Sequence, residues 1–135
     1  MTGARTAAII IARLLFAFAF AQGAAFKFVF VGMDATGSQI AAAGFPAPML
    51  LAWVAAFLEI GLAIAFLTGL LFSEAAIVAT AYVLFLAFSF YGPEHWNGDL
   101  MTYGLFSSHL PFIAGLLFAA VHGPGDAMVL RRRTV

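Results

Sequence analysis

Four long stretches of almost uninterrupted hydrophobic residues dominate the sequence. They cover residues 7–32, 48–72, 75–91 and 103–121, and most charged and turn-forming residues lie between them. Each stretch approaches the roughly 20 residues that a helix needs to cross a hydrocarbon layer about 30 Å thick. The strict alternation of apolar and polar residues that marks the strands of a membrane barrel is absent. The pattern therefore predicts four membrane-spanning helices.

The connections between these stretches are short. Residues 33–47 hold small polar residues and the turn Gly44-Phe45-Pro46, Ser73-Glu74 joins the second stretch to the third, and residues 92–99 form a polar loop. Helices joined so tightly run antiparallel to their neighbours. We therefore expect an all-α, integral membrane four-helix bundle, formed by a single transmembrane domain over residues 1–135.

Composition supports a membrane protein and excludes several other classes. Hydrophobic residues make up 64% of the chain and charged residues 9%, against about 45–50% and 25% in soluble domains. A soluble domain of this size cannot bury so much apolar surface. The net charge of zero leaves no basic field to hold nucleic acid. The absence of cysteine excludes disulfides, cysteine-ligated zinc and cysteine-ligated iron–sulfur clusters.

The distribution of basic residues predicts an orientation. Arg5 and Arg13 lie at the start of the first stretch and arginines occupy positions 131–133, whereas the loops after the first and third stretches carry only acidic charges. Basic segments stay in the cytoplasm. We therefore expect both termini in the cytoplasm and both acidic loops outside.

The first stretch has an alternative interpretation as a secretory signal. Ala19-Phe20-Ala21 ahead of Gln22 resembles a signal-peptidase site that follows an apolar run. Arg13 in the middle of that run argues against cleavage, because it fits the signal pattern poorly. We therefore expect the first stretch to remain as a span.

Three charged residues lie inside the predicted spans, where a charge at a helix centre costs at least about 2.5–3.5 kcal/mol. Glu59 lies near the middle of the second span, and Arg13 and Lys27 lie on either side of the midpoint of the first. The two basic residues are 14 positions apart, close to four helical turns, so they point in similar directions. Both are long enough to snorkel to the interfaces or to reach toward Glu59. Glu59 is too short to reach water, so it needs a structural partner or serves a ligand or a proton.

His109 lies about two turns inside the outer end of the fourth span, and a packing role is its simplest interpretation. Together with His95 and the acidic residues of the loops it offers imidazole and carboxylate groups for a metal ion. The spacing matches no closed zinc motif, so no metal site is predicted. His122 falls at the opposite end of the span, which argues against a haem held by two histidines.

Small residues recur at four-residue spacing in several spans. Examples are Ala17, Ala21 and Ala25 in the first span and Gly61 and Ala65 in the second. Such repeats let helices approach closely, so we expect them to face the inside of the bundle.

The order of several short motifs resembles the DoxX family of small four-helix bacterial membrane proteins. These motifs are Arg13-Leu14-Leu15, Gly23 with Lys27, Gly44-Phe45-Pro46-Ala47-Pro48, Phe57-Leu58-Glu59-Ile60-Gly61 and Thr68-Gly69-Leu70. One departure is that Gly23 stands four residues before Lys27, where the family usually places glycine three before the lysine. The resemblance covers nearly the whole chain and implies a multi-pass protein of the bacterial inner membrane.

The resemblance also implies an association with redox enzymes. The family takes its name from a subunit of an archaeal thiosulfate:quinone oxidoreductase, and other members resemble membrane partners of oxidoreductases. It therefore implies a membrane subunit associated with a quinone-linked oxidoreductase system. The implied partners are the lipid bilayer and other membrane or redox subunits, and a quinone is the implied cofactor.

A pocket for a quinone or lipid inside the bundle would need a few polar groups in apolar surroundings. Lys27, His109 and Tyr103 offer protons to a carbonyl, Glu59 accepts or relays a proton, and Arg13 is the fifth candidate. The alternative function is a non-catalytic scaffold, assembly or anchoring subunit. A transporter is a more distant alternative, because four short helices leave little room for alternating access.

Overall fold

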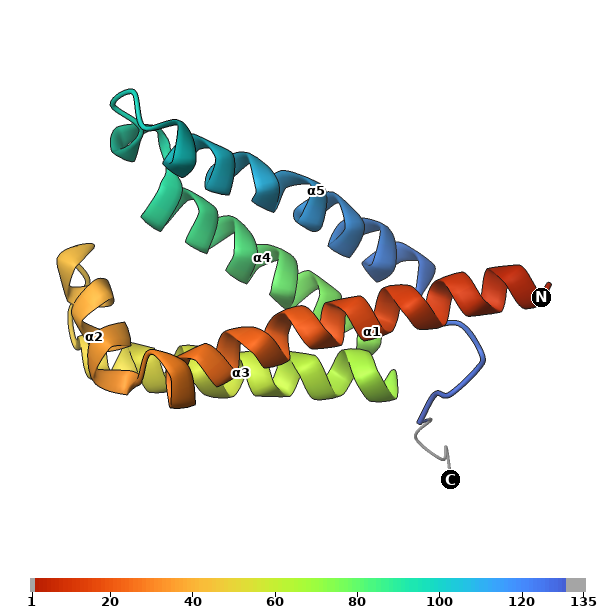
Figure 1. Cartoon of the computed structure of the whole chain (residues 1–135). Helices are drawn as coiled ribbons and strands as arrows, with labels where there is room; N and C mark the ends of the chain where they lie inside the picture. Colours follow the sequence, from red (N-terminus) through yellow and green to blue (C-terminus); the bar gives the residue numbers. More distant parts are fainter. Residues whose placement is uncertain (1, 131–135) are drawn as a thin grey trace. The chain divides into compact units, whose positions relative to one another are not determined.

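The computed structural model describes residues 2–130, and all regular structure in that part is helical (Figure 1). The α-helices are α1 (Gly3–Ala25), α2 (Met33–Ala42), α3 (Pro48–Thr68), α4 (Phe72–Tyr91) and α5 (Leu100–His122). A π-helical turn, η1 (Phe26–Phe30), continues α1, and a 3-10 turn, η2 (Pro93–His95), follows α4. The arginines at 131–133, which contribute to the predicted orientation, lie outside the described residues.

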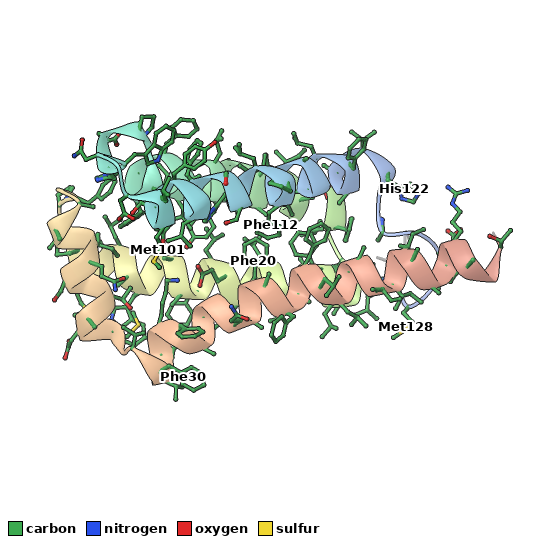
Figure 2. All side chains as sticks on the ribbon, turned by 45° about the horizontal axis from the view of Figure 1, so that its top comes forward. Phe20, Phe30, Met101, Phe112, His122 and Met128 are labelled. Atoms are coloured by element: carbon green, nitrogen blue, oxygen red, sulfur yellow. The ribbon has the colours of Figure 1, made fainter. Side chains whose placement is uncertain are left out.

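Four helical segments in the described part are long and apolar enough to cross a membrane: α1 with η1, α3, α4 with η2, and α5. They coincide with the four predicted stretches, so the prediction of an all-helical membrane protein is confirmed. Large apolar side chains cover the outer faces of these helices, as Phe30 at the end of η1 illustrates (Figure 2). Phe30 is 73% exposed, which is the surface expected to contact lipid.

The boundaries differ from the prediction at two connections. Residues 33–47 contain the ten-residue helix α2, which the hydrophobic pattern did not indicate because the segment is too short and too polar to span a membrane. The second span ends at Thr68 rather than near residue 72, because Gly69 adopts a left-handed conformation with φ 76°. Leu71 is also left-handed, at φ 50°, and α4 begins at the next residue.

The chain forms two compact units. The first contains α1, η1, α2, α3 and the segment that begins at Pro124, and the second contains α4, η2 and α5. In the first unit α1 and α3 lie side by side and antiparallel, and α2 packs against α3 (Figure 1). In the second unit α4 and α5 form an antiparallel hairpin, closed by the polar loop predicted for residues 92–99.

The contact between α1 and α3 is a regular seam of buried positions. Its members in α1 are Arg13, Ala17, Phe20 and Ala24, and its members in α3 are Ala52, Ala56, Glu59, Leu62 and Phe66. Successive members are three or four residues apart and average close to 3.5, which is the pattern of helices packed at a small angle. Lys27 continues the same spacing from α1, so Arg13 and Lys27 stand two heptads apart on one seam. Phe20 stacks on Phe66 with ring centres 5.7 Å apart.

The seam is not built from the four-residue repeats of small residues. Ala17 is buried, but Ala21 and Gly61 are exposed. The expectation that these repeats face inward is therefore wrong for Ala21 in the first span and for Gly61 in the second. The physical reason is the seam's period of 3.5 residues, since a strict four-residue repeat drifts off such a seam within two turns.

The second unit is held by apolar packing along α4 and α5. The buried residues of α4 are Phe72, Ala76, Ala79, Val83 and Ala87, and Leu116 is fully buried in α5. Asp99 caps the start of α5 by accepting hydrogen bonds from the side chain of Thr102 and from the backbone N–H groups of Thr102 and Met101. These bonds favour the ionised carboxylate and lower the pKa of Asp99 below its ordinary value.

Arg13 binds backbone carbonyl groups from two distant segments. Its guanidinium donates to the carbonyl oxygens of Phe66, at 3.1 Å, and Leu67, at 2.8 Å, at the end of α3. It also donates to Ala127 and Met128, both at 2.8 Å, in the segment after α5. The last carbonyls of a helix lack intrahelical partners and carry the negative end of its dipole, so they attract a cation.

Both predictions for the Arg13 side chain, that it snorkels to the interface or reaches toward Glu59, are therefore wrong. The side chain is only 3% exposed, so it does not snorkel to water, and its donors are directed to carbonyls rather than to Glu59. A further bond from the Leu130 N–H to the Thr68 carbonyl, at 2.8 Å, reinforces the same connection. Arg13 thus fastens the segment after α5 to the end of α3.

Replacing Arg13 tests this connection. Arg13→Leu should lower the free energy of unfolding by roughly 3 kcal/mol, because buried carbonyl groups lose a charged donor. Unfolding in mixed detergent micelles measures the change, and amide exchange at Leu130 should accelerate in the same variant. Arg5→Leu removes an exposed arginine from the same helix and is the matched control. Equal stability of the two variants would contradict the structural role of Arg13.

Candidate functional site

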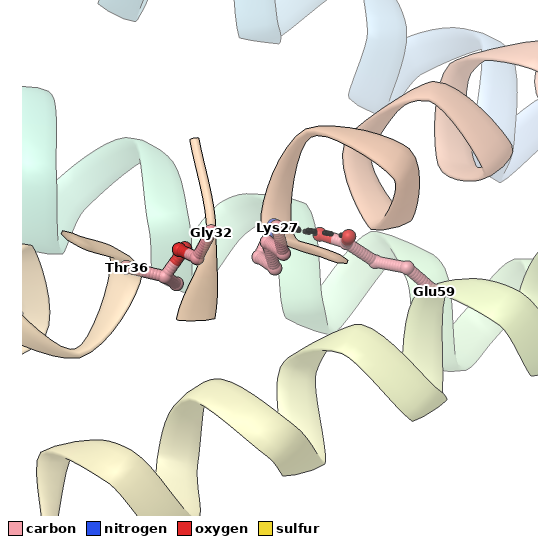
Figure 3. Close-up of polar contacts among 4 residues, drawn as sticks. All are labelled: Lys27, Gly32, Thr36 and Glu59. Carbon is pink, nitrogen blue, oxygen red and sulfur yellow. Dashed lines mark hydrogen bonds and ion pairs between the residues drawn. The ribbon is translucent and has the colours of Figure 1, made fainter. Parts of the chain in front are cut away.

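Lys27 and Glu59 form an ion pair inside the first unit (Figure 3). The Lys27 ammonium donates to both carboxylate oxygens of Glu59, at 2.9 Å to Oε1 and 3.0 Å to Oε2. The side chain of Glu59 is 5% exposed and that of Lys27 is 21% exposed. The expectation that Glu59 finds a polar partner in the first span is confirmed, and the partner is Lys27.

Lys27 occupies an unusual piece of backbone. It lies in η1, where the Val31 N–H donates to the Phe26 carbonyl five residues earlier, at 2.8 Å. A π-helical turn inserts an extra residue into a helix and redirects the side chains that follow, and such turns are frequent at functional sites. In this chain η1 ends at Phe30, and Gly32, with a φ of 91°, separates it from α2. Next to it, the Thr36 hydroxyl donates to the Gly32 carbonyl at 2.9 Å (Figure 3).

The ion pair is costly as a purely structural device. Placing one charge at the centre of a membrane helix, as at Glu59, costs about 2.5–3.5 kcal/mol on insertion scales, and burying most of the Lys27 ammonium adds a further cost. At the separation of 2.9 Å seen here, the two charges attract by about 6 kcal/mol at an effective dielectric constant of 20, which does little more than offset the cost of removing them from water. A buried pair of this kind is often no more stabilising than two apolar side chains of similar size. Stability alone therefore does not explain why Lys27 and Glu59 stand at these positions.

An aromatic cluster lies on the same two helical segments as the pair. Phe28 follows Lys27 in η1 and packs on Trp53 of α3, with ring centres 5.5 Å apart. Phe57 completes the cluster at 6.0 Å from each of the other two rings. Trp53 and Phe57 are 40% and 62% exposed, so this unit combines flat aromatic surface with an ion pair.

The other two candidates, His109 and Tyr103, lie in the second unit. His109 donates from Nδ1 to the Leu105 carbonyl of its own helix, and its ring packs on Tyr91 with centres 5.4 Å apart. Tyr103 packs edge-on against Trp96 at 5.0 Å. These contacts give both residues a packing role. The structure thus joins Lys27 and Glu59 and binds Arg13 to carbonyls. It packs His109 on Tyr91 of α4 and Tyr103 on Trp96 of the loop before α5.

Among residues 2–130, no three His, Asp or Glu side chains gather into a group that could hold a metal ion. Pro111 lies inside α5 and has no N–H to donate to the Ser107 carbonyl four residues earlier. Neither the search for metal-binding groups nor Pro111 adds a residue to the candidates for the functional site. Among the candidate residues, the ion pair of Lys27 with Glu59 is therefore the arrangement best suited to acid–base chemistry.

Comparison with known proteins agrees with the resemblance noted in the sequence. The model of the DoxX family matches residues 8–92, which is more than half of the chain. The matched region includes Arg13, Lys27 and Glu59 but ends before Tyr103 and His109. No curated protein and no solved structure matches the chain.

A double-mutant cycle tests the coupling between Lys27 and Glu59. Lys27→Met should lower the free energy of unfolding by about 3–5 kcal/mol, because it leaves a buried carboxylate without its counter-ion. The double variant Lys27→Met with Glu59→Leu should recover most of that loss, because no unpaired charge remains. Gln22→Met introduces the same side chain at an exposed position of α1 and is the control. If the effects of Lys27→Met alone and Glu59→Leu alone add up to the effect of the double variant, the two residues are not coupled.

Proposed function

Because the chain belongs to the DoxX family, we propose that it is a membrane subunit of a quinone-linked oxidoreductase system. The observation that carries the proposal is the Lys27–Glu59 pair, a proton donor in contact with a proton acceptor inside an apolar span. Reduction of a quinone to a quinol needs protons as well as electrons, and both must arrive where the apolar quinone resides. A positioned acid and base meet the first requirement.

The arrangement of the pair fits a quinone carbonyl as the approaching group. A lysine ammonium has three N–H donors, and the structure directs Lys27 toward two oxygens of Glu59. Lys27 is the more exposed partner, so a ligand entering from the membrane reaches the ammonium before the carboxylate. In the proposal the Lys27 ammonium donates a hydrogen bond to the carbonyl and transfers a proton to it on reduction, and the Glu59 carboxylate accepts protons from the aqueous side and passes them to Lys27, for both of the protons that the quinol takes up. The electrons come from a partner redox subunit.

The four apolar spans place the chain in a lipid bilayer, in contact with lipid. We propose the bacterial inner membrane as its location, with a single domain and both termini in the cytoplasm. Arg5 and Arg13, both in the first half of α1, support this orientation. Under it, Arg13 lies in the cytoplasmic half of α1 and Lys27 toward the outer end.

The alternative function is a non-catalytic scaffold or anchoring subunit. The observation that favours it is the set of hydrogen bonds made by Arg13, which join the end of α3 to the segment after α5. A scaffold needs the Lys27–Glu59 pair only for stability. The two functions therefore differ in what they predict for a variant that keeps the fold and lacks both charges.

The double variant Lys27→Met with Glu59→Leu separates the two functions. The complex is purified in mild detergent, its subunits and lipids are identified by mass spectrometry, and electron transfer to a short-chain quinone is measured. The proposal predicts normal assembly and a loss of quinone-dependent activity of about 100-fold or more, the usual contribution of general acid–base catalysis. Glu59→Gln should keep the fold and show the same loss. Full activity of an assembled double variant would contradict the proposal and leave the scaffold function.

A further inference from the structure

The carboxylate of Glu59 lies directly against the backbone of α1 at Gly23. A Cβ atom built on Gly23 would stand 2.9 Å from Oε2, 3.1 Å from Cδ and 3.3 Å from Oε1 of Glu59. Carbon and oxygen atoms do not approach so closely without a shift of one of them. Gly23 therefore occupies a position where any other side chain would compete with the carboxylate for space.

The backbone itself does not require glycine at this position. Gly23 lies within α1, outside the positive-φ region, so alanine fits its backbone conformation. Glycine is unfavourable inside a helix relative to alanine, because it loses more conformational entropy on folding. The reason for glycine at this position is therefore the space it leaves for Glu59, and Lys27 lies about one turn further along the chain.

We propose that Gly23 is a positioning residue of the Lys27–Glu59 site. Its missing side chain admits the Glu59 carboxylate between α1 and α3, close enough to the α1 backbone for Lys27 to reach both oxygens. This inference deepens the proposed function, and its consequence for quinone chemistry rests on that function. The geometric part concerns the ion pair alone and is measured without a quinone.

An alanine at position 23 displaces the carboxylate rather than the helices. The atoms that would collide with the new methyl group belong to the end of a flexible side chain, which moves more easily than backbone. Movement of the carboxylate away from α1 lengthens its bonds to the Lys27 ammonium, now 2.9 and 3.0 Å. The helix pair persists while the ion pair weakens, which distinguishes positioning from general packing.

The sequence offers a selective probe of this effect, because Lys27 is its only lysine. The rate at which an amine-specific reagent modifies Lys27 is measured in detergent micelles, with circular dichroism as a check of helix content. Gly23→Ala should raise this rate about 10- to 100-fold, the change expected when a charge-assisted hydrogen bond is lost. Gly61→Ala is the matched control, since a Cβ at Gly61 meets no atom within 4 Å.

A rescue variant separates positioning from packing. Glu59→Asp shortens the acidic side chain by one methylene, which leaves room for the new methyl group but draws the carboxylate away from Lys27, so Gly23→Ala with Glu59→Asp should fold at least as stably as Gly23→Ala and be modified as fast. If Gly23→Ala does not fold, folding of the double variant supports the proposal, and failure of both variants to fold overturns it. A folded Gly23→Ala protein with the wild-type modification rate also overturns it. Accelerated modification with unchanged quinone-dependent activity keeps the positioning role and contradicts the proposed function instead.

Discussion

A charged group inside a membrane span must find a partner, and this constraint organises the first unit of the protein. Glu59 cannot reach water from the middle of α3, so α1 must bring a donor to it. Lys27 is that donor, and it lies on the same seam as Arg13, which binds the carbonyls at the end of α3. The two cations therefore bind α3 at two points, Lys27 near its middle and Arg13 at its end. Ala17 and Ala24 are the buried small residues of α1 between them.

The two attachments differ in what they offer to chemistry. Arg13 is almost completely buried, and its donors are directed to carbonyl oxygens that lack helical partners, so its role is structural. Lys27 is partly exposed, and its partner is the carboxylate of a side chain rather than a backbone carbonyl. An ion pair in this position adds little to stability compared with apolar packing. The proposed role in proton transfer to a quinone would account for a feature that stability leaves unexplained.

The sequence predicts the spans and the need for a partner at Glu59, because both follow from the properties of the bilayer. The length of each apolar stretch and the short reach of a glutamate side chain are enough for these conclusions. The partners of Arg13 were not predictable, since they include carbonyls of Ala127 and Met128, more than 110 residues away in the chain. Helix α2 was missed because it does not cross the membrane, and η1 because no residue pattern marks a π-turn. Gly23 stood in the motif with Lys27, but its contact with Glu59 depends on the register between α1 and α3.

The central claim is that Lys27 and Glu59 are in direct contact inside the membrane. Solid-state NMR of the protein in lipid bilayers measures it most directly, as the dipolar coupling between ¹⁵N at Lys27 Nζ and ¹³C in glutamate carboxylates. Because Lys27 is the only lysine, the nitrogen signal needs no assignment, and Glu59→Gln identifies the carboxylate. The structure predicts a strong coupling, consistent with the bonds of 2.9 and 3.0 Å, that disappears in Glu59→Gln. Absence of this coupling in the folded wild-type protein would show that Lys27 and Glu59 are not in contact.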